Sequence, residues 1–157
     1  AEVGSSPFWA QLLSELRGLP RVRCVVCLGI GNFSHHPAPR YQLALAFLIR
    51  ETLSAGNCDS PGSTAEEAVA LSLYDPVLQP AEIEYARSCG CQVPTSNAMG
   101  FVQALAGEGE SSLFFMPHCA KQLYSNVLAA NYSVERLSAL AVLGNSFQSY
   151  MQVEGTR

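Results

Sequence analysis

The feature that most constrains this 157-residue chain is a run of apolar residues that leads into a glycine turn and then into a helix pattern. Residues 22–28 show almost no alternation of polar and apolar side chains, which is typical of a parallel strand covered on both faces. Gly29 and Gly31 follow at once, and a helix is predicted over residues 39–53, with Gly56 as its end. Strand, turn and helix in this order predict the opening of a βαβ unit.

The same rhythm of strands and helices continues along the rest of the chain. Further strands are predicted at 69–74, 91–93, 113–116 and 139–143. Helices are predicted within 1–20 and at 80–89, 97–106 and 120–130, with a short one capped by Ser133. The pattern predicts an α/β fold, Rossmann-like, with a mostly parallel sheet of about five strands and helices on both faces.

The chain divides into a capping helix at 1–20 and a single domain at 21–157. A stretch near 56–67 is rich in Gly, Asn, Asp, Ser and Pro and has no periodicity, which predicts a polar surface insertion.

Charge and cysteine content narrow the classes of function. The net charge is −4 and the basic residues are scattered, so nucleic acid is not expected as a partner. The longest apolar stretch is far too short for a membrane span, and the first residues do not resemble a secretory signal. Six cysteines in a chain of this length suit reduced thiols. We expect a soluble intracellular protein, cytoplasmic or nuclear, without a membrane partner.

Polar and glycine residues follow several of the predicted strands. Ligands of open parallel sheets bind outside the carboxyl ends of the strands, so these positions are the candidate ligand-binding residues. They are Gly29, Gly31, Asn32, Asp75, His118, Cys119, Asn145 and Ser146. Turns and helix caps also favour short polar residues, so the convergence of many positions on one crevice carries the argument.

The glycine turn partly matches the dinucleotide fingerprint. Gly29 and Gly31 stand at its first two glycines, but Ser34 replaces the third. Asp75, at the end of the second strand, is placed to accept hydrogen bonds from ribose hydroxyls, although Asp before Pro is also a common turn starter. The cofactor is left open between S-adenosylmethionine and a dinucleotide, with haem ranked behind both.

His118 and Cys119 are the residues best suited to chemistry. An imidazole titrates near neutral pH and lowers the pKa of a nearby thiol, so the pair could supply a proton carrier and a nucleophile. A buried, unreactive thiol is the alternative for Cys119. His35 and His36 could join His118 at a metal, but adjacent histidines in a Pro-rich turn are commonly solvated, so no metal site is predicted.

Five blocks of the sequence together resemble the sensitivity-to-red-light-reduced (SRR-like) domain family. They are Cys-Leu-Gly-Ile-Gly-Asn-Phe at 27–33, Tyr-Asp-Pro at 74–76, Phe-Met-Pro-His-Cys at 115–119, Leu-Tyr-Ser-Asn-Val-Leu at 123–128 and Leu-Gly-Asn-Ser-Phe at 143–147. The resemblance implies an intracellular eukaryotic regulator linked to light signalling and circadian-clock input, with no established biochemical activity. The chain departs from the family's pattern at Ala120, where glycine is usual, and in the longer stretch at 94–109.

Three functions remain open at this point. The leading hypothesis is a regulatory protein whose domain binds a small nucleoside-containing ligand, with a small molecule, a protein or both as partners. The rival is a methyltransferase-like or other nucleotide-cofactor enzyme, although Cys27 stands where such enzymes often have an acidic residue. The third is an interaction module without a ligand, since fold alone does not decide function.

Overall fold

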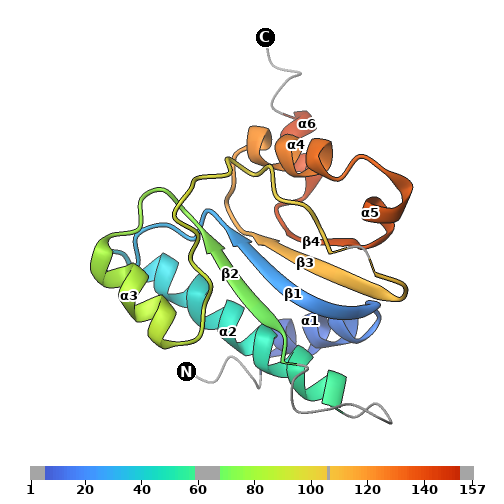
Figure 1. The fold of residues 1–157 in the computed structure, drawn as a ribbon, viewed down its shortest axis with the longest axis horizontal. Helices are drawn as coiled ribbons and strands as arrows, with labels where there is room; N and C mark the ends of the chain where they lie inside the picture. Colours follow the sequence, from blue (N-terminus) through green and yellow to red (C-terminus); the bar gives the residue numbers. More distant parts are fainter. Residues whose placement is uncertain (1–5, 59–67, 106, 153–157) are drawn as a thin grey trace.

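A computed structural model describes residues 6–58, 68–105 and 107–152. It contains a parallel sheet with the strand order β2-β1-β3-β4 (Figure 1). The strands are β1 (Arg21–Leu28), β2 (Ala70–Tyr74), β3 (Glu110–Met116) and β4 (Leu140–Gly144). The predicted α/β class is therefore confirmed.

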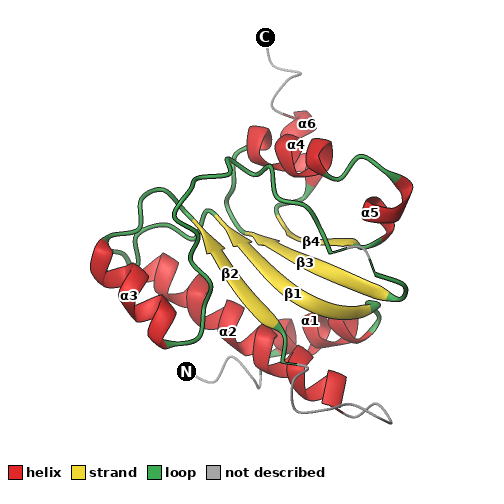
Figure 2. Cartoon of the chain, viewed as in Figure 1, coloured by secondary structure: helices red, strands yellow, loops and turns green. Residues whose placement is uncertain are grey.

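Helices cover both faces of the sheet, as predicted (Figure 2). They are α1 (Pro7–Arg17), α2 (Pro37–Cys58), α3 (Pro80–Ser88), α4 (Lys121–Ala130), α5 (Val134–Ser138) and α6 (Phe147–Gln152). Alternate residues of β1 point to opposite faces, so Val25 packs with α1, α2 and α3 while Val26 packs with α4. Among the described helices, none combines the length and the apolar composition that a bilayer crossing requires.

The ends of several helices follow the predicted signals. Pro80 is the first residue of α3, and Gly90 follows that helix with a φ of 76°. The Ser133 hydroxyl accepts a hydrogen bond from the Arg136 N–H at 3.3 Å and so caps α5. These ends are set by local chemistry, which explains why the sequence alone predicts them.

The predicted end of the long helix is wrong. α2 begins at Pro37 and runs through Gly56 to Cys58, because the packing of Leu43, Ala46 and Ile49 on the sheet outweighs one unfavourable glycine. The beginning of the expected polar insertion is therefore helical. Its remainder, residues 59–67, lies outside the described residues.

The sheet has four strands in the described part of the chain, one fewer than expected. Residues 91–93 form only a single bridge, between Gln92 and Ser72 at the edge of β2. Gly90 precedes this stretch and Pro94 follows it, and proline cannot donate to a strand ladder, so pairing stops after one bridge.

The helix predicted over 97–106 is also wrong. Met99 and Gly100 have φ values of 50° and 85°, and two successive left-handed residues are incompatible with an α-helix. A side chain of α4 and the side chain of the residue that follows this helix hold the segment instead: Asn126 donates to the Met99 carbonyl at 2.7 Å, and Asn131 bonds to Val102 and Ala104. Tertiary hydrogen bonds override helix propensity here. Residue 106 lies outside the described residues, and α6 was not predicted.

Candidate functional site

The strand order defines where a ligand site is expected. In the sheet, β2 lies next to β1 on one side and β3 lies next to β1 on the other. The chain therefore reverses its direction across the sheet between β2 and β3. In open α/β sheets, ligands bind at such a switch point, outside the carboxyl ends of the strands. The turns that follow β1 and β3 meet at this point, close to the end of β2 (Figure 1).

A cavity of about 430 Å³ lies at this edge of the sheet, and we call it the switch-point cleft. Four of the predicted residues line it: Gly29, Asp75, His118 and Cys119. Lining residues that sequence reasoning did not identify include Leu28, Tyr74, Met99, Gln122, Leu123 and Asn126. No lysine or arginine is among the described residues that line the cleft, so the Asp75 carboxylate makes the cleft acidic.

The predicted residues Gly31, Asn32, Asn145 and Ser146 do not line this cleft. Gly31 and Asn32 belong to the turn after β1. The Asn32 side chain accepts the His35 N–H at 3.1 Å, so it shapes the turn before α2.

The backbone N–H groups that a phosphate would need at this turn are already hydrogen-bonded to carboxylates. The Gly31 N–H donates to Asp75 Oδ2 at 2.6 Å, and the Ser34 N–H donates to Glu82 Oε1 at 2.6 Å. In a phosphate-binding turn, such N–H groups point at the ligand. A pyrophosphate at this turn would instead meet two acidic side chains, and like charges repel.

Glu82 is the residue of this region that sequence reasoning missed. It is only 1% exposed, and its second oxygen accepts the Gln79 N–H at 2.7 Å in a capping box of α3. Burial by itself raises the pKa of the Glu82 carboxyl, but hydrogen bonds from the backbone of Gln79 and Ser34 outweigh it and the pKa is lowered. The capping-box spacing from Gln79 to Glu82 was the available sequence signal.

Glu82→Gln should destabilise the protein by about 2 kcal/mol at pH 7, because an amide can accept in place of only one carboxylate oxygen. A lowered pKa contributes stability above the unfolded value of about 4.3 and loses it as the pH falls through the folded value. The difference in the free energy of unfolding between variant and parent should therefore be smaller at about pH 3 than at pH 7. Urea unfolding at both pH values measures it. Glu84→Gln, at an exposed position of the same helix, controls for the change in charge. If the difference is the same at both pH values, the charge of the Glu82 carboxylate is not what stabilises the fold.

Cys119 is held as a neutral thiol. Its Sγ lies 3.2 Å from the Leu28 carbonyl oxygen, to which it donates. Burial, with a smaller contribution from the Asp75 charge, raises the pKa of this thiol to about 11. A thiol that is protonated at neutral pH is a poor nucleophile, which supports the unreactive alternative. Gly29 permits this packing, since a Cβ there would lie 2.8 Å from the sulfur.

His118 and Asn145 have different surroundings. His118 is exposed at the rim of the cleft with a φ of 57°, and its backbone N–H donates to Asn145 Oδ1 at 3.1 Å. Asn145 also donates from its backbone to the Tyr124 hydroxyl at 2.8 Å and from its side chain to the Tyr150 hydroxyl at 2.7 Å. Asn145 therefore fixes the turn that carries His118, and both ends of its amide are engaged.

The remaining histidines lie apart from this arrangement. His35 and His36 are exposed in the turn before α2. Within the described ranges, no group of three or more His, Cys, Asp or Glu residues is arranged to hold a metal ion.

Comparison with known proteins matches residues 9–156 to the SRR1 domain. The chain is 35% identical to "Protein SENSITIVITY TO RED LIGHT REDUCED 1" of Arabidopsis thaliana, over 95% of this chain and 53% of that protein. It is 35% identical to a mouse SRR1-like protein, over 81% of this chain and 45% of the relative, and 27% identical to one from Drosophila melanogaster, over 87% and 44%. The chain thus spans about half the length of these relatives. No solved structure matches it.

Proposed function

Because the chain belongs to the SRR1 domain family, we propose that it is a regulatory domain of the light-signalling type and that its switch-point cleft binds a small nucleoside-containing ligand. The regulatory part rests on the plant relative, whose name refers to red-light sensitivity. The ligand part rests on the cleft. Circadian-clock input is the form of regulation that the family resemblance implies.

The observation that carries the ligand proposal is the meeting of residues from three strand ends at one cavity. Gly29, Asp75 and His118 follow β1, β2 and β3 and line the same space. Its volume of about 430 Å³ falls within the range of small-molecule sites, roughly 300 to 1,000 Å³. Leu28 and Leu123 supply apolar surface for a base, while Gln122 and Asn126 supply polar groups.

The charge of the cleft favours a neutral or cationic ligand. Asp75 is acidic, and the described residues that line the cleft include no lysine or arginine, although the His118 side chain lies at the rim. Both Asp75 oxygens accept one backbone N–H each, from Gly31 and Val77, and a carboxylate has further lone pairs that a ribose hydroxyl can use. We therefore favour S-adenosylmethionine, which carries a sulfonium cation, over a dinucleotide.

A thermal-shift titration tests this proposal. S-adenosylmethionine or S-adenosylhomocysteine at a hundred times its dissociation constant should stabilise the fold by about 2.7 kcal/mol and raise Tm by roughly 5 to 10 °C. NAD, NADPH and ADP should give no shift, because the acidic turn disfavours phosphate. Ala120→Trp, just before α4, should remove the shift by filling the cleft from an exposed position, whereas Ala129→Trp, at an exposed position near the end of α4, should keep it.

Other results of the titration would point to a different ligand or a different function. A shift with NAD or ADP would overturn the argument from the carboxylates at the turn. Consumption of the methyl donor during the titration would make the domain an enzyme. If none of the nucleosides shifts Tm at millimolar concentration, the cleft is not a nucleoside site and the domain is better described as an interaction module.

A further inference from the structure

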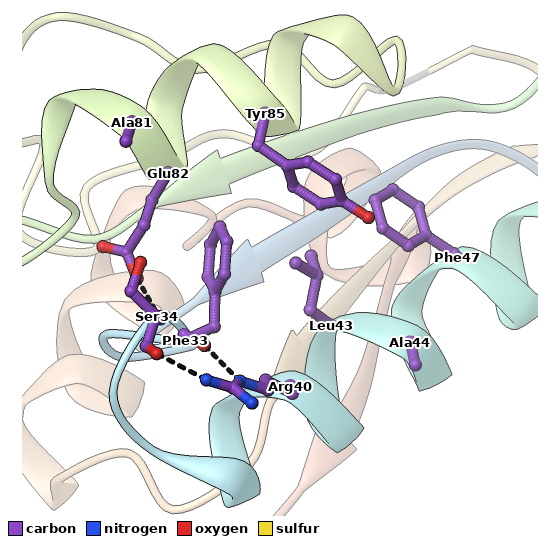
Figure 3. Close-up of a pocket in the computed structure, with 9 residues that line it drawn as sticks. All are labelled: Phe33, Ser34, Arg40, Leu43, Ala44, Phe47, Ala81, Glu82 and Tyr85. Atoms are coloured by element: carbon purple, nitrogen blue, oxygen red, sulfur yellow. Dashed lines mark hydrogen bonds between the residues drawn. The ribbon is translucent and has the colours of Figure 1, made fainter.

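A second cavity lies between α2 and α3, and we call it the α2–α3 pocket (Figure 3). Its volume is about 420 Å³. Six apolar or aromatic residues form most of its wall: Phe33, Leu43, Ala44, Phe47, Ala81 and Tyr85. It shares no lining residue with the switch-point cleft.

The pocket presents aromatic surface on several sides. Figure 3 shows the rings of Phe33, Phe47 and Tyr85 around the space above Leu43. The Phe33 and Tyr85 ring centroids are 6.1 Å apart, with the planes tilted by 58°. Phe33 is almost completely buried, but Tyr85 is 53% exposed. At this separation the two rings already pack on each other, so a flat aromatic molecule would lie against the Phe33–Tyr85 pair and Phe47 and not between the paired rings.

Arg40 gives the pocket a charged end. Its Nε donates to the Phe33 carbonyl at 2.7 Å and its Nη2 donates to the Ser34 carbonyl. A guanidinium has five N–H donors, and these two bonds fix its plane while leaving others for a ligand. Among the described residues, its hydrogen-bond partners are neutral carbonyl groups, so its positive charge is not matched by a carboxylate bonded to it.

Glu82, the acidic residue in the described lining of the pocket, is engaged by the backbone. Both Glu82 oxygens accept backbone N–H groups, from Ser34 and Gln79. Glu82 and Arg40 both bind the backbone of Ser34, Glu82 at its N–H and Arg40 at its carbonyl. At this end of the pocket an anionic group on a ligand would be attracted to the Arg40 guanidinium and kept away from the Glu82 side of Ser34. The pocket therefore orients a ligand that is aromatic at one end and anionic at the other.

We infer that the α2–α3 pocket binds a planar aromatic carboxylic acid of one or two rings, with its carboxylate on Arg40 and its ring against Phe33, Phe47 and Tyr85. The apolar wall provides burial for the ring, and a guanidinium held in a fixed plane suits the two oxygens of a carboxylate. This inference does not depend on the proposed function of the switch-point cleft.

Naphthalene-2-carboxylate is the probe for this site, measured by isothermal titration calorimetry and by amide chemical shifts. We expect saturable binding, with shifts concentrated at the Phe33 turn, α2 and α3. Naphthalene-2-carboxamide, which has the same ring and no charge, should bind about tenfold more weakly, since a charge-assisted hydrogen bond adds roughly 1.4 kcal/mol.

Variants separate the pocket from other surfaces. Ala44→Trp should abolish binding by filling the pocket from an exposed position of α2, while Glu51→Trp, exposed on the same helix and outside the pocket, should leave it unchanged. Arg40→Gln should remove the preference for the acid over the amide, and Arg40→Lys should retain part of it. Ala120→Trp, which fills the cleft, should have no effect.

Three results would overturn the inference. They are the absence of saturable binding by the parent protein, binding that survives Ala44→Trp, and equal affinity for the acid and the amide. Thermal unfolding of each variant confirms that the folded protein is being titrated, and the Ala44→Trp result keeps the test decisive if Arg40→Gln disturbs the Phe33 turn.

Discussion

Asn131→Leu should destabilise the protein by about 4 kcal/mol, although leucine has the same branched shape and the same number of side-chain heavy atoms as asparagine. Asn131 is 0% exposed, its Oδ1 accepts the Ala104 N–H at 2.7 Å, and its Nδ2 donates to the carbonyls of Val102 and Val127 at 2.9 and 2.8 Å. Leucine would leave three backbone groups without their partner, and each buried unsatisfied group costs about 1 to 3 kcal/mol. Urea unfolding followed by circular dichroism measures the loss.

Two further variants test this explanation of Asn131. Asn131→Asp keeps the acceptor for Ala104 but removes both donors, so it should be destabilising as well. Asn97→Ala removes an exposed asparagine whose side chain accepts only the Met99 N–H, and it should cost less than about 1 kcal/mol. A loss below about 1 kcal/mol for Asn131→Leu would show that water replaces the side chain. The three hydrogen bonds of Asn131 would then contribute little to stability.

Gly144→Ala should cost about 3 kcal/mol or more, which is a large loss for a single methyl group. A Cβ at this position would lie 2.3 Å from the Tyr124 hydroxyl oxygen and 2.9 Å from the Met116 carbonyl oxygen. That hydroxyl cannot move freely, because it donates to the Met116 carbonyl at 2.5 Å and accepts the Asn145 N–H at 2.8 Å. Overpacking in such a site typically costs about 1 to 3 kcal/mol, and here a hydrogen bond is also lost.

A double-mutant cycle with Tyr124→Phe isolates the cause of this loss. Tyr124→Phe alone should cost about 2 kcal/mol, because two bonded backbone groups lose the hydroxyl. With the hydroxyl gone, the closest contact to the new methyl group is removed, so the double variant should cost clearly less than the sum of the two single variants. Strict additivity would show that the hydroxyl is not the obstacle.

The elements that the sequence predicts well are those fixed by local patterns. The mostly apolar sequence of β1 and the cap at Ser133 need no information from distant residues. The segment at 97–105 could not be predicted in this way, because asparagines in and directly after the distant helix α4 determine its conformation. The expected strand at 91–93 failed for a related reason, since pairing depends on a neighbour rather than on propensity alone.

The candidate site shows the same division. The rule that ligands bind beyond strand ends predicted that Gly29, Asp75, His118 and Cys119 share one crevice. The structure places these four residues at one cavity, and their contact with a ligand stays a prediction. The sequence could not show that the Gly31 amide is already used by Asp75, 44 residues away, or the Ser34 amide by Glu82, 48 residues away. It also placed Asn145 with the ligand residues, whereas the side chain bonds to the His118 turn and to Tyr150.

The strand order has a consequence for how the chain folds. In a sheet without hairpins, every strand pair joins residues that are distant in sequence, as Val25 pairs with both Leu71 and Leu113. Each pairing closes a long loop before it gains contacts, which slows folding relative to a helical bundle of equal size. The central strand β1 is synthesised before both of its neighbours. During synthesis, one edge of β1 therefore stays unpaired until β2 is made and the other until β3 is made. Incorrect strand pairing is most favoured in this interval.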